Sequence, residues 1–268
     1  MPFFSIILPT YNSEQTLLKA LESVAEQTFK DFEVLIMDGG STDRTSQIVE
    51  EWQGNDPRFH FHQEADTGVY NAMNKGILLA KGKYLYFMGS DDYFAEKNVL
   101  ETVANKIENV DFFYGNVRFV HSGEIYSGES SLEKLVYKRI SICHQSIFYS
   151  KKVFDILGGY NEKYFIHADH DYNIKCFEED SIRKKYDDMV IAVFNEQGLS
   201  GKESNKDGYK DVITERIFAN DKELLKIKRE KENLERQVIE LKTSKSYKIG
   251  RAIVGPFSFL INKFKKRS

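Results

Sequence analysis

Two adjacent carboxylates, Asp91 and Asp92, follow directly on the apolar run "YLYFMG" that begins at Tyr84. Two interpretations are open. The acids or Ser90 could cap the start of a helix, or the acids could bind a metal ion or a sugar phosphate at the end of a strand. No G-x-G-x-x-G motif follows the first apolar run, and no G-x-x-x-x-G-K-[ST] motif occurs anywhere. A phosphate-bearing ligand would therefore need a divalent cation, held by carboxylates, to offset its charge.

Similar polar turns end three earlier segments that we predict to be strands. They are "PTYN" at the end of residues 3–9, "DGGSTD" at the end of residues 32–38 and "EADTG" at the end of residues 59–64. Helix-like segments separate these runs, one over residues 13–27 with Ser13 as its predicted N-cap and one over residues 70–82 closed by Gly82. This alternation predicts a parallel α/β sheet with helices on both faces, in which ligands bind beyond the carboxyl ends of the strands. Caps and turns explain each polar turn singly, but they explain the set poorly.

The second half of the chain is less regular. It predicts strands over residues 111–120, 123–128, 143–150 and 189–195, helices over residues 151–160 and 167–180, and a Gly/Ser loop over residues 196–204. The two cysteines, Cys143 and Cys176, lie far apart without metal-like spacing, which fits a reducing compartment. The N-terminus is expected to be the first strand, neither a signal peptide nor a membrane span.

The C-terminal part differs in charge from the rest. After Glu240 the sequence has eight basic residues and no acidic one, although the whole chain carries a net charge of −3. We expect a catalytic domain over residues 1–206 and a helical extension over residues 207–268. Imperfect heptads in the extension permit a homodimer through this helix. The basic, apolar end is typical of a segment on an anionic membrane surface, and the alternative is a tail that packs on the body or on a partner subunit.

The motifs resemble those of a family of sugar-transferring enzymes. "SIILPTYN", "VLIMDGGSTDRT" and "DTGVYNAMNKGILLAKGKYLYFMGSDD" are similar to a family 2 glycosyltransferase with the A-type nucleotide-sugar fold, and "HQSIFYS…HADHDYNIK" and "EQGLSG" extend the likeness to about residue 205. The resemblance is to a subgroup that makes bacterial O-antigen and related surface polysaccharides. It implies a mixed, mainly parallel central sheet with helices on both faces, here followed by the helical extension.

The resemblance also implies an activity. The chain is expected to be an inverting, metal-dependent enzyme that moves a sugar from a nucleotide-sugar, expected to be UDP-linked, to a polyprenyl-diphosphate-linked saccharide. It would act in the cytoplasm, peripherally at the inner face of the cell membrane, without a nucleic-acid partner. The alternatives are a non-catalytic nucleotide-sugar-binding scaffold of a polysaccharide assembly complex and, less favoured, a nucleotidyltransferase. The latter would normally show a Gly-rich, basic phosphate loop.

The resemblance assigns the donor site residue by residue. Asp92 would bind the metal, Mn²⁺ or Mg²⁺, and Asp91 the ribose. The other implied contacts with the nucleotide-sugar are Pro9, Thr10 and Tyr11 around the base, Glu14 at the nucleoside, Asp38 at the uracil N3–H, Asp66 at the donor sugar, and Asn74 and Lys75. Many relatives carry an arginine at the position of Met73, so one phosphate partner is missing. Lys75 could replace it only if its helix presents it to the site.

Asp169 is the candidate general base, because inverting transfer needs a carboxylate that takes the proton of the acceptor hydroxyl. In the family the base usually sits in a Glu-Asp pair, where this chain has Ala168 and Asp169, so Asp171 remains an alternative. His144, His167 and His170 could contact the metal, the diphosphate or the acceptor, or they could be structural. The loop "NEQGLSG" is expected to close over the bound donor.

Overall fold

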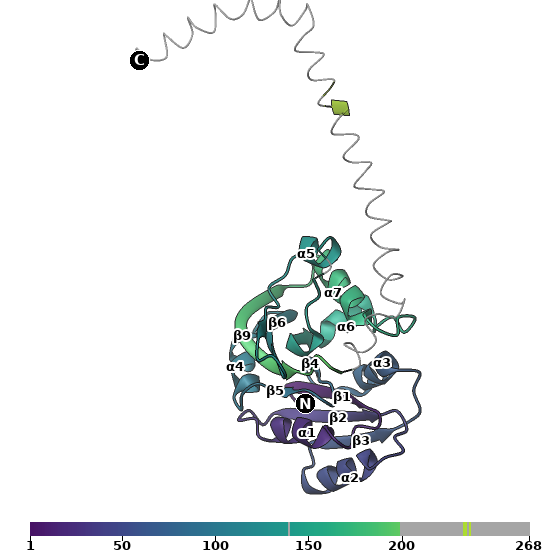
Figure 1. Ribbon diagram of the computed structural model, residues 1–268. Coiled ribbons are helices and arrows are strands. Elements are labelled where there is room, and N and C mark those ends of the chain that lie inside the picture. Colours follow the sequence, from purple (N-terminus) through teal and green to yellow (C-terminus); the bar gives the residue numbers. More distant parts are fainter. Residues whose placement is uncertain (139, 199–232, 235, 237–268) are drawn as a thin grey trace, which may run out of the picture. The chain divides into compact units, whose positions relative to one another are not determined.

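The computed structural model describes residues 1–138, 140–198, 233, 234 and 236, drawn in colour in Figure 1. The chain divides into two compact units, Met1–Thr214 and Glu215–Ser268. The predicted boundary at residue 206, the basic tail and, apart from residues 233, 234 and 236, the whole predicted helical extension lie outside the described residues. The fold below is that of the first unit.

The described strands form one sheet. Its order is β3-β2-β1-β4-β8-β6-β9-β5, with β7 beside β6. The strands are β1 Phe4–Thr10, β2 Phe32–Asp38, β3 Phe59–Gln63, β4 Tyr84–Phe87, β5 Tyr93–Phe94, β6 Phe112–Phe119, β7 Ile125–Tyr126, β8 Ile147–Ser150 and β9 Lys184–Phe194. β1 to β4 pair in parallel, as do β6 and β9, whereas β8 is antiparallel to both its neighbours, β4 and β6. The predicted mixed, mainly parallel sheet is confirmed.

Helices cover the apolar side chains on both faces of the sheet. They are α1 Leu17–Ala25, α2 Thr45–Asn55, α3 Val69–Leu79, α4 Val99–Lys106, α5 Leu132–Val136, α6 Lys151–Leu157 and α7 Ala168–Glu178, with a single 3₁₀ turn, η1, at His144–Ser146. Alternate residues of a strand point to opposite faces. Ile6 and Leu8 of β1 accordingly share a core cluster with Leu17 of α1, whereas Ile7 lies against Gly76 of α3. Helices therefore lie on both faces, as predicted.

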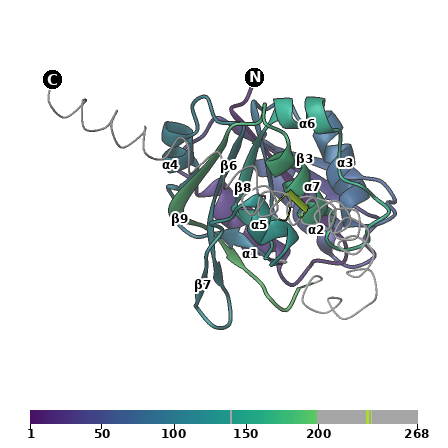
Figure 2. The same cartoon turned by 90° about the horizontal axis from the view of Figure 1, so that it is seen from above.

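Figure 2 shows the same arrangement from above, with the hairpin of β6 and β7 extending away from the helices. Within residues 1–138 and 140–198, none of the helices is long and apolar enough to cross a membrane.

Two predicted helix ends were wrong. α1 begins at Leu17 rather than after Ser13, because Ser13 is held by residues distant in sequence. Its backbone N–H donates to Thr45 Oγ1 at 2.7 Å, and its hydroxyl lies 2.8 Å from that of Ser90. α3 ends at Leu79 rather than at Gly82.

Gly82 has a packing role instead. A Cβ at this position would meet the backbone N of Ser5 and would lie 2.7 Å from the carbonyl carbon of Phe4. Backbone atoms of a central strand cannot move aside as a flexible side chain can. Glycine at position 82 therefore allows the chain to pass close to β1 immediately before β4 begins.

We expect Gly82→Ala to lower the free energy of unfolding by about 1–3 kcal/mol, the usual cost of overpacking a close contact. Chemical denaturation measures this loss. Gly54→Ala in α2 is the matched control, because nothing lies within 4 Å of a Cβ there. The control should be as stable as the wild type or slightly more stable, since alanine is the better helix former. Equal stability of the Gly82→Ala protein and the wild type would contradict this account.

Candidate active site

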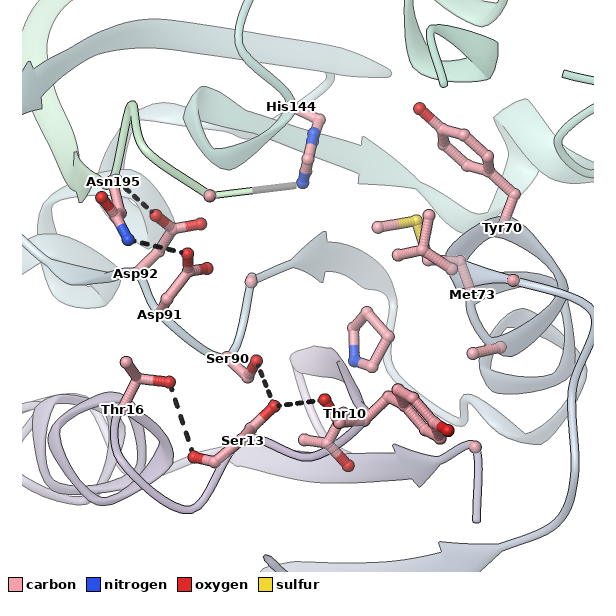
Figure 3. A pocket seen from close by; sticks show the side chains of 18 of the residues that line it. Thr10, Ser13, Thr16, Tyr70, Met73, Ser90, Asp91, Asp92, His144 and Asn195 are labelled. Atoms are coloured by element: carbon pink, nitrogen blue, oxygen red, sulfur yellow. Dashed lines mark hydrogen bonds between the residues drawn. The ribbon is translucent and has the colours of Figure 1, made fainter. Parts of the chain in front are cut away.

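A cavity of about 800 Å³ lies beyond the carboxyl ends of the parallel strands. All four predicted polar turns reach it: the first through residues 9–13, the second through Gly39, the third through Asp66–Gly68 and the fourth through Gly89–Asp92. Its remaining lining comes from Thr16 before α1, from the first turns of α3, from His144 and Gln145 of η1, from Phe165 and Ile166 before α7, and, at and after the end of β9, from Phe194, Asn195, Gln197 and Gly198. Figure 3 shows this pocket.

Asp92 is the most buried acid of the pocket, with 2% of its surface exposed. Its Oδ1 accepts a hydrogen bond from the Asn195 backbone N–H at 2.8 Å, and its Oδ2 accepts one from Gln145 Nε2 at 2.6 Å. Burial, and then the charge of Asp91, raise the pKa of Asp92 to about 7. Asp91 Oδ2 accepts from Asn195 Nδ2 at 2.9 Å, so Asn195 ties both carboxylates together (Figure 3).

These two carboxylates fit a divalent cation. Mg²⁺ and similar hard ions take oxygen ligands, commonly one or two carboxylates completed by substrate phosphate oxygens and water. Within the described residues no group of three or more His, Cys, Asp or Glu side chains could hold a metal by itself. The donor set of Asp91 and Asp92 therefore suits an ion whose remaining ligands arrive with a phosphate.

The charge of the pocket supports this fit. Its described lining holds three carboxylates, those of Asp66, Asp91 and Asp92, together with His144, and contains no lysine or arginine. Met73, at the position where the resemblance led us to expect an arginine, is buried against the pocket. A diphosphate entering this pocket would meet like charge unless a cation came with it.

Asn74 and Lys75 follow Met73 on α3, but neither belongs to the pocket lining. The Asn74 side chain bonds the backbone of Tyr160 through both its oxygen and its nitrogen, and also bonds Glu162. Lys75 Nζ lies 2.9 Å from the Ala65 carbonyl oxygen and 2.9 Å from Glu64 Oε1. Both side chains therefore stabilise segments next to the pocket.

Asp38 and Glu14 also lie outside the lining. The buried Asp38 carboxylate accepts hydrogen bonds from the side chains of Thr10, Ser41 and Gln63 and from the backbone N–H groups of Gly40 and Ser41. Burial alone would raise the pKa of Asp38, but the bonds from Ser41, Gln63 and Thr10 hold it below its ordinary value. Glu14 Oε2 accepts from the Arg44 N–H at 3.0 Å, just before α2. The two acids fix the second turn, and their contact with the nucleoside stays a prediction.

Asp169 stands in the first turn of α7, behind two residues that line the pocket. Its Oδ1 accepts from the Tyr70 hydroxyl at 2.9 Å, and its Oδ2 lies 3.2 Å from His144 Nδ1. Burial would raise the pKa of Asp169, but the hydrogen bond and charge of His144 and the bond from Tyr70 outweigh it and hold the pKa well below its ordinary value. The side chain keeps 16% of its surface exposed.

The rival carboxylate, Asp171, is differently placed. It is buried and pairs with Lys175 at 2.7 Å on the same helix. Among the three histidines of interest, His144 alone lines the pocket. His167 takes a left-handed backbone conformation with φ 73° before α7, and the ring of the buried His170 lies 3.1 Å from the Leu135 carbonyl oxygen.

Comparison with known proteins agrees with this geometry. Glycosyl transferase family 2 matches residues 5–158. The chain belongs to this family. A PGL/p-HBAD biosynthesis glycosyltransferase of Mycobacterium tuberculosis is 42% identical to it over 201 residues, which are 74% of this chain and 78% of the relative. Chondroitin synthase of Escherichia coli is 28% identical over 190 residues, which are 66% of this chain but 27% of that protein.

Solved structures share the glycosyltransferase's A-type fold. Staphylococcus aureus TarS 1–349 in complex with UDP superposes with a TM-score of 0.63 at 25% identity, covering 73% of this chain and 60% of TarS 1–349. The Pyrobaculum calidifontis mannosyltransferase PcManGT, in complex with GDP-Man and Mn²⁺, gives a TM-score of 0.60 at 16% identity, covering 94% of this chain and 83% of that one. The predicted fold is therefore confirmed.

The structure also brings residues to the glycosyltransferase site that the sequence did not single out. Gln145 and Asn195 hold Asp92, and Tyr70 holds Asp169. The signals that could have found them were weak: Gln145 is the neighbour of His144, and Asn195 opens the loop "NEQGLSG". That loop was predicted to cover the donor; Asn195, Gln197 and Gly198 line the pocket, and its later residues lie outside the described part of the chain.

Proposed function

We propose that this glycosyltransferase is an inverting, metal-dependent enzyme. It moves a sugar from a nucleotide-sugar, UDP-linked in our proposal, to a polyprenyl-diphosphate-linked saccharide in bacterial surface polysaccharide synthesis. One observation carries the proposal: the described pocket lining offers a diphosphate the adjacent carboxylates of Asp91 and Asp92 and no lysine or arginine, while the separate carboxylate of Asp169 lies behind Tyr70 and His144. The adjacent pair suits a cation, and Asp169 suits proton transfer.

The donor side has two supports. The first is the pocket itself, where Tyr11 keeps 64% of its surface exposed and so has a ring face free to stack on a base. The second is the set of related folds, since TarS was solved with UDP and with UDP-GlcNAc, and PcManGT with GDP-Man and Mn²⁺. Asp92 would hold the metal and Asp91, beside it, would bind the ribose; the metal, when bound, would offset the charge that grows on the leaving diphosphate.

In the transfer step, Asp169 acts as the general base. An acceptor hydroxyl attacks the anomeric carbon from the side opposite the diphosphate, a bond forms from the oxygen to this carbon, and the bond to the diphosphate breaks. Asp169 takes the proton of the attacking hydroxyl. Tyr70 and His144 hold its carboxylate in place, whereas Asp171 is engaged by Lys175, so the geometry favours Asp169 as the base.

The acceptor side rests on composition and on the relatives. The chain has eight basic residues and no acidic one after Glu240, and apolar residues lie among them. Such a segment suits an anionic membrane surface, so we place the enzyme in the cytoplasm at the inner face of the cell membrane, where a lipid-linked acceptor would be anchored. The mycobacterial relatives are described as enzymes of PGL/p-HBAD biosynthesis.

A screen of nucleotide-sugars by thermal unfolding tests the donor and the metal together. We expect one UDP-sugar to raise the melting temperature in Mn²⁺ and to raise it little in EDTA. At a ligand concentration of a hundred times Kd the gain is about 2.7 kcal/mol, or roughly 5–10 °C for a domain of this size. The product made from the donor that binds then defines the linkage. If no nucleotide-sugar stabilises the protein in Mn²⁺, or if EDTA makes no difference, the proposal fails.

A further inference from the structure

Two consecutive residues of η1 each hold a different carboxylate of the site. We propose that η1 is the positioning element of the enzyme: His144 positions the base carboxylate of Asp169, and Gln145 positions the metal carboxylate of Asp92. The inference rests on the proposed function, because it takes its roles for Asp169 and Asp92 from there. Both residues are positioning residues, acting on the reaction through the acids that they hold.

The first contact is that of His144 with Asp169. Its Nδ1 lies 3.2 Å from Asp169 Oδ2, and the Tyr70 hydroxyl holds the other oxygen of the same carboxylate at 2.9 Å. The ring comes from η1 and points into the pocket (Figure 3). With Nδ1–H donating, the carboxylate is clamped between two donors that belong to different elements, and its rotation is fixed.

The second contact is that of Gln145 with Asp92. Gln145 is 3% exposed, and its Nε2 donates to Asp92 Oδ2 at 2.6 Å. Its Oε1 accepts from Cys143 Sγ at 2.8 Å, which orients the amide so that its N–H faces the acid. A hydrogen bond from such a donor stabilises an ionised carboxylate more than a protonated one. Gln145 therefore favours the ionised form of Asp92, which is the form that binds a cation.

The turn itself is held by β4, the strand that leads into the turn with the metal carboxylate. Tyr86 of β4 donates its hydroxyl to the Gln145 carbonyl oxygen at 2.7 Å, and β8, which follows η1 directly, pairs antiparallel with β4. Within the turn, the Ser146 hydroxyl and backbone N–H both donate to the Cys143 carbonyl oxygen, at 2.7 and 2.9 Å. A rigid turn anchored on β4 can hold the two acids, which are far apart in sequence, in one fixed relation.

The inference predicts that the two residues affect different quantities. Gln145→Met keeps the size of the side chain and removes the donor, so it should raise the Kd for Mn²⁺ by about 10- to 100-fold, as removal of a residue supporting a metal ligand typically does. Saturating Mn²⁺ should restore part of the turnover that this variant loses at low Mn²⁺. His144→Leu should lower kcat at least about tenfold, within the range of a misaligned general base, and leave the Kd for Mn²⁺ unchanged.

His144→Asn is the conservative variant, because its amide N–H can replace Nδ1–H while the ring nitrogen Nε2 is lost. It should recover most of the turnover that His144→Leu loses. The Kd for Mn²⁺ is measured by calorimetry with UDP present and without acceptor, which is a readout independent of activity. Cys143→Ala, which removes the donor to Gln145 Oε1, is a milder second variant and should weaken Mn²⁺ binding in the same direction if Gln145→Met fails to fold.

Three results would overturn the inference. They are an unchanged Kd for Mn²⁺ in both the Gln145→Met and Cys143→Ala proteins, an unchanged kcat in His144→Leu, and a His144→Asn protein no better than His144→Leu. A different result would contradict the proposed function: the Asp169→Asn protein would itself keep its turnover. Loss of turnover in Asp169→Asn together with normal turnover in His144→Leu would remove the inference alone.

Discussion

Asp169→Asn should lower kcat by about 10²- to 10⁴-fold, the usual contribution of a general base, while nucleotide-sugar binding stays close to that of the wild type. The reason is chemical: an asparagine amide fits the same space and can still accept from Tyr70, but it takes no proton from an acceptor hydroxyl at neutral pH. Steady-state kinetics with the identified donor gives kcat, and calorimetry with the same donor gives the binding constant.

Asp171→Asn is the matched control for this variant. Asp171 lies one half-turn along α7 and is engaged by Lys175, so its replacement should lower the free energy of unfolding and leave turnover in place. If instead Asp171→Asn loses turnover and Asp169→Asn keeps it, the base assignment reverses. Full turnover in both variants would show that neither acid takes the proton. A non-catalytic scaffold predicts no turnover in the wild type at all.

Asp92→Asn should abolish the Mn²⁺ dependence of donor binding and, at the same time, stabilise the metal-free protein at high pH. The folded protein holds the pKa of Asp92 at about 7, raised from 3.8 by burial and then by Asp91. Between these two values the unfolded chain has lost the proton and the folded chain has kept it. The free energy of unfolding therefore falls as the pH rises from about 4 to 7, by up to about 4 kcal/mol for this group, and the loss is complete above pH 7.

An asparagine at position 92 has no proton to lose, so this fall disappears. Urea denaturation in EDTA should find Asp92→Asn more stable than the wild type at pH 8, with a smaller difference at pH 5. Mn²⁺ with the donor should stabilise the wild type at pH 8 and leave the variant unchanged, since the metal replaces the proton on this acid. Asp155→Asn, an exposed acid on α6, is the control and should follow the wild type throughout.

Two results would contradict these predictions for Asp92. A variant that binds donor with the Mn²⁺ dependence of the wild type would show that the metal is held elsewhere. A wild-type protein whose stability falls no more steeply with pH than that of Asp92→Asn would show that Asp92 does not keep its proton near neutral pH.

The strands and turns that build the pocket were predictable because they are local patterns. β1 to β4 are short strand-like segments with polar turns at their carboxyl ends, and parallel pairing alone brings those ends to one edge. Helix ends were less predictable, because distant contacts decide them. Ser13 forms hydrogen bonds with Thr45 and Ser90 and does not cap α1.

The roles of α3 residues depend on which face of the helix meets the sheet, and a single sequence leaves this open. Tyr70 and Met73, three positions apart, both line the pocket. Each residue is rotated by about 100° round the helix, so Lys75 lies about 140° from Tyr70 and away from this face. Asn74 lies only about 40° from Tyr70, and its side chain instead bonds Tyr160 and Glu162 beside the pocket. Gln145 and Asn195 reach Asp92 from elements far along the chain, through pairings across the sheet that no local pattern encodes.

The anomeric configuration of the transferred sugar tests the central claim most directly. The protein is given an α-linked UDP-sugar, Mn²⁺ and a lipid-linked acceptor, and the anomeric proton of the product is observed by nuclear magnetic resonance. Attack opposite the diphosphate, with Asp169 taking the proton, predicts a β-linked product in the wild type and its absence in Asp169→Asn and Asp92→Asn. An α-linked product, or a β-linked product formed equally by the two variants, would contradict the account.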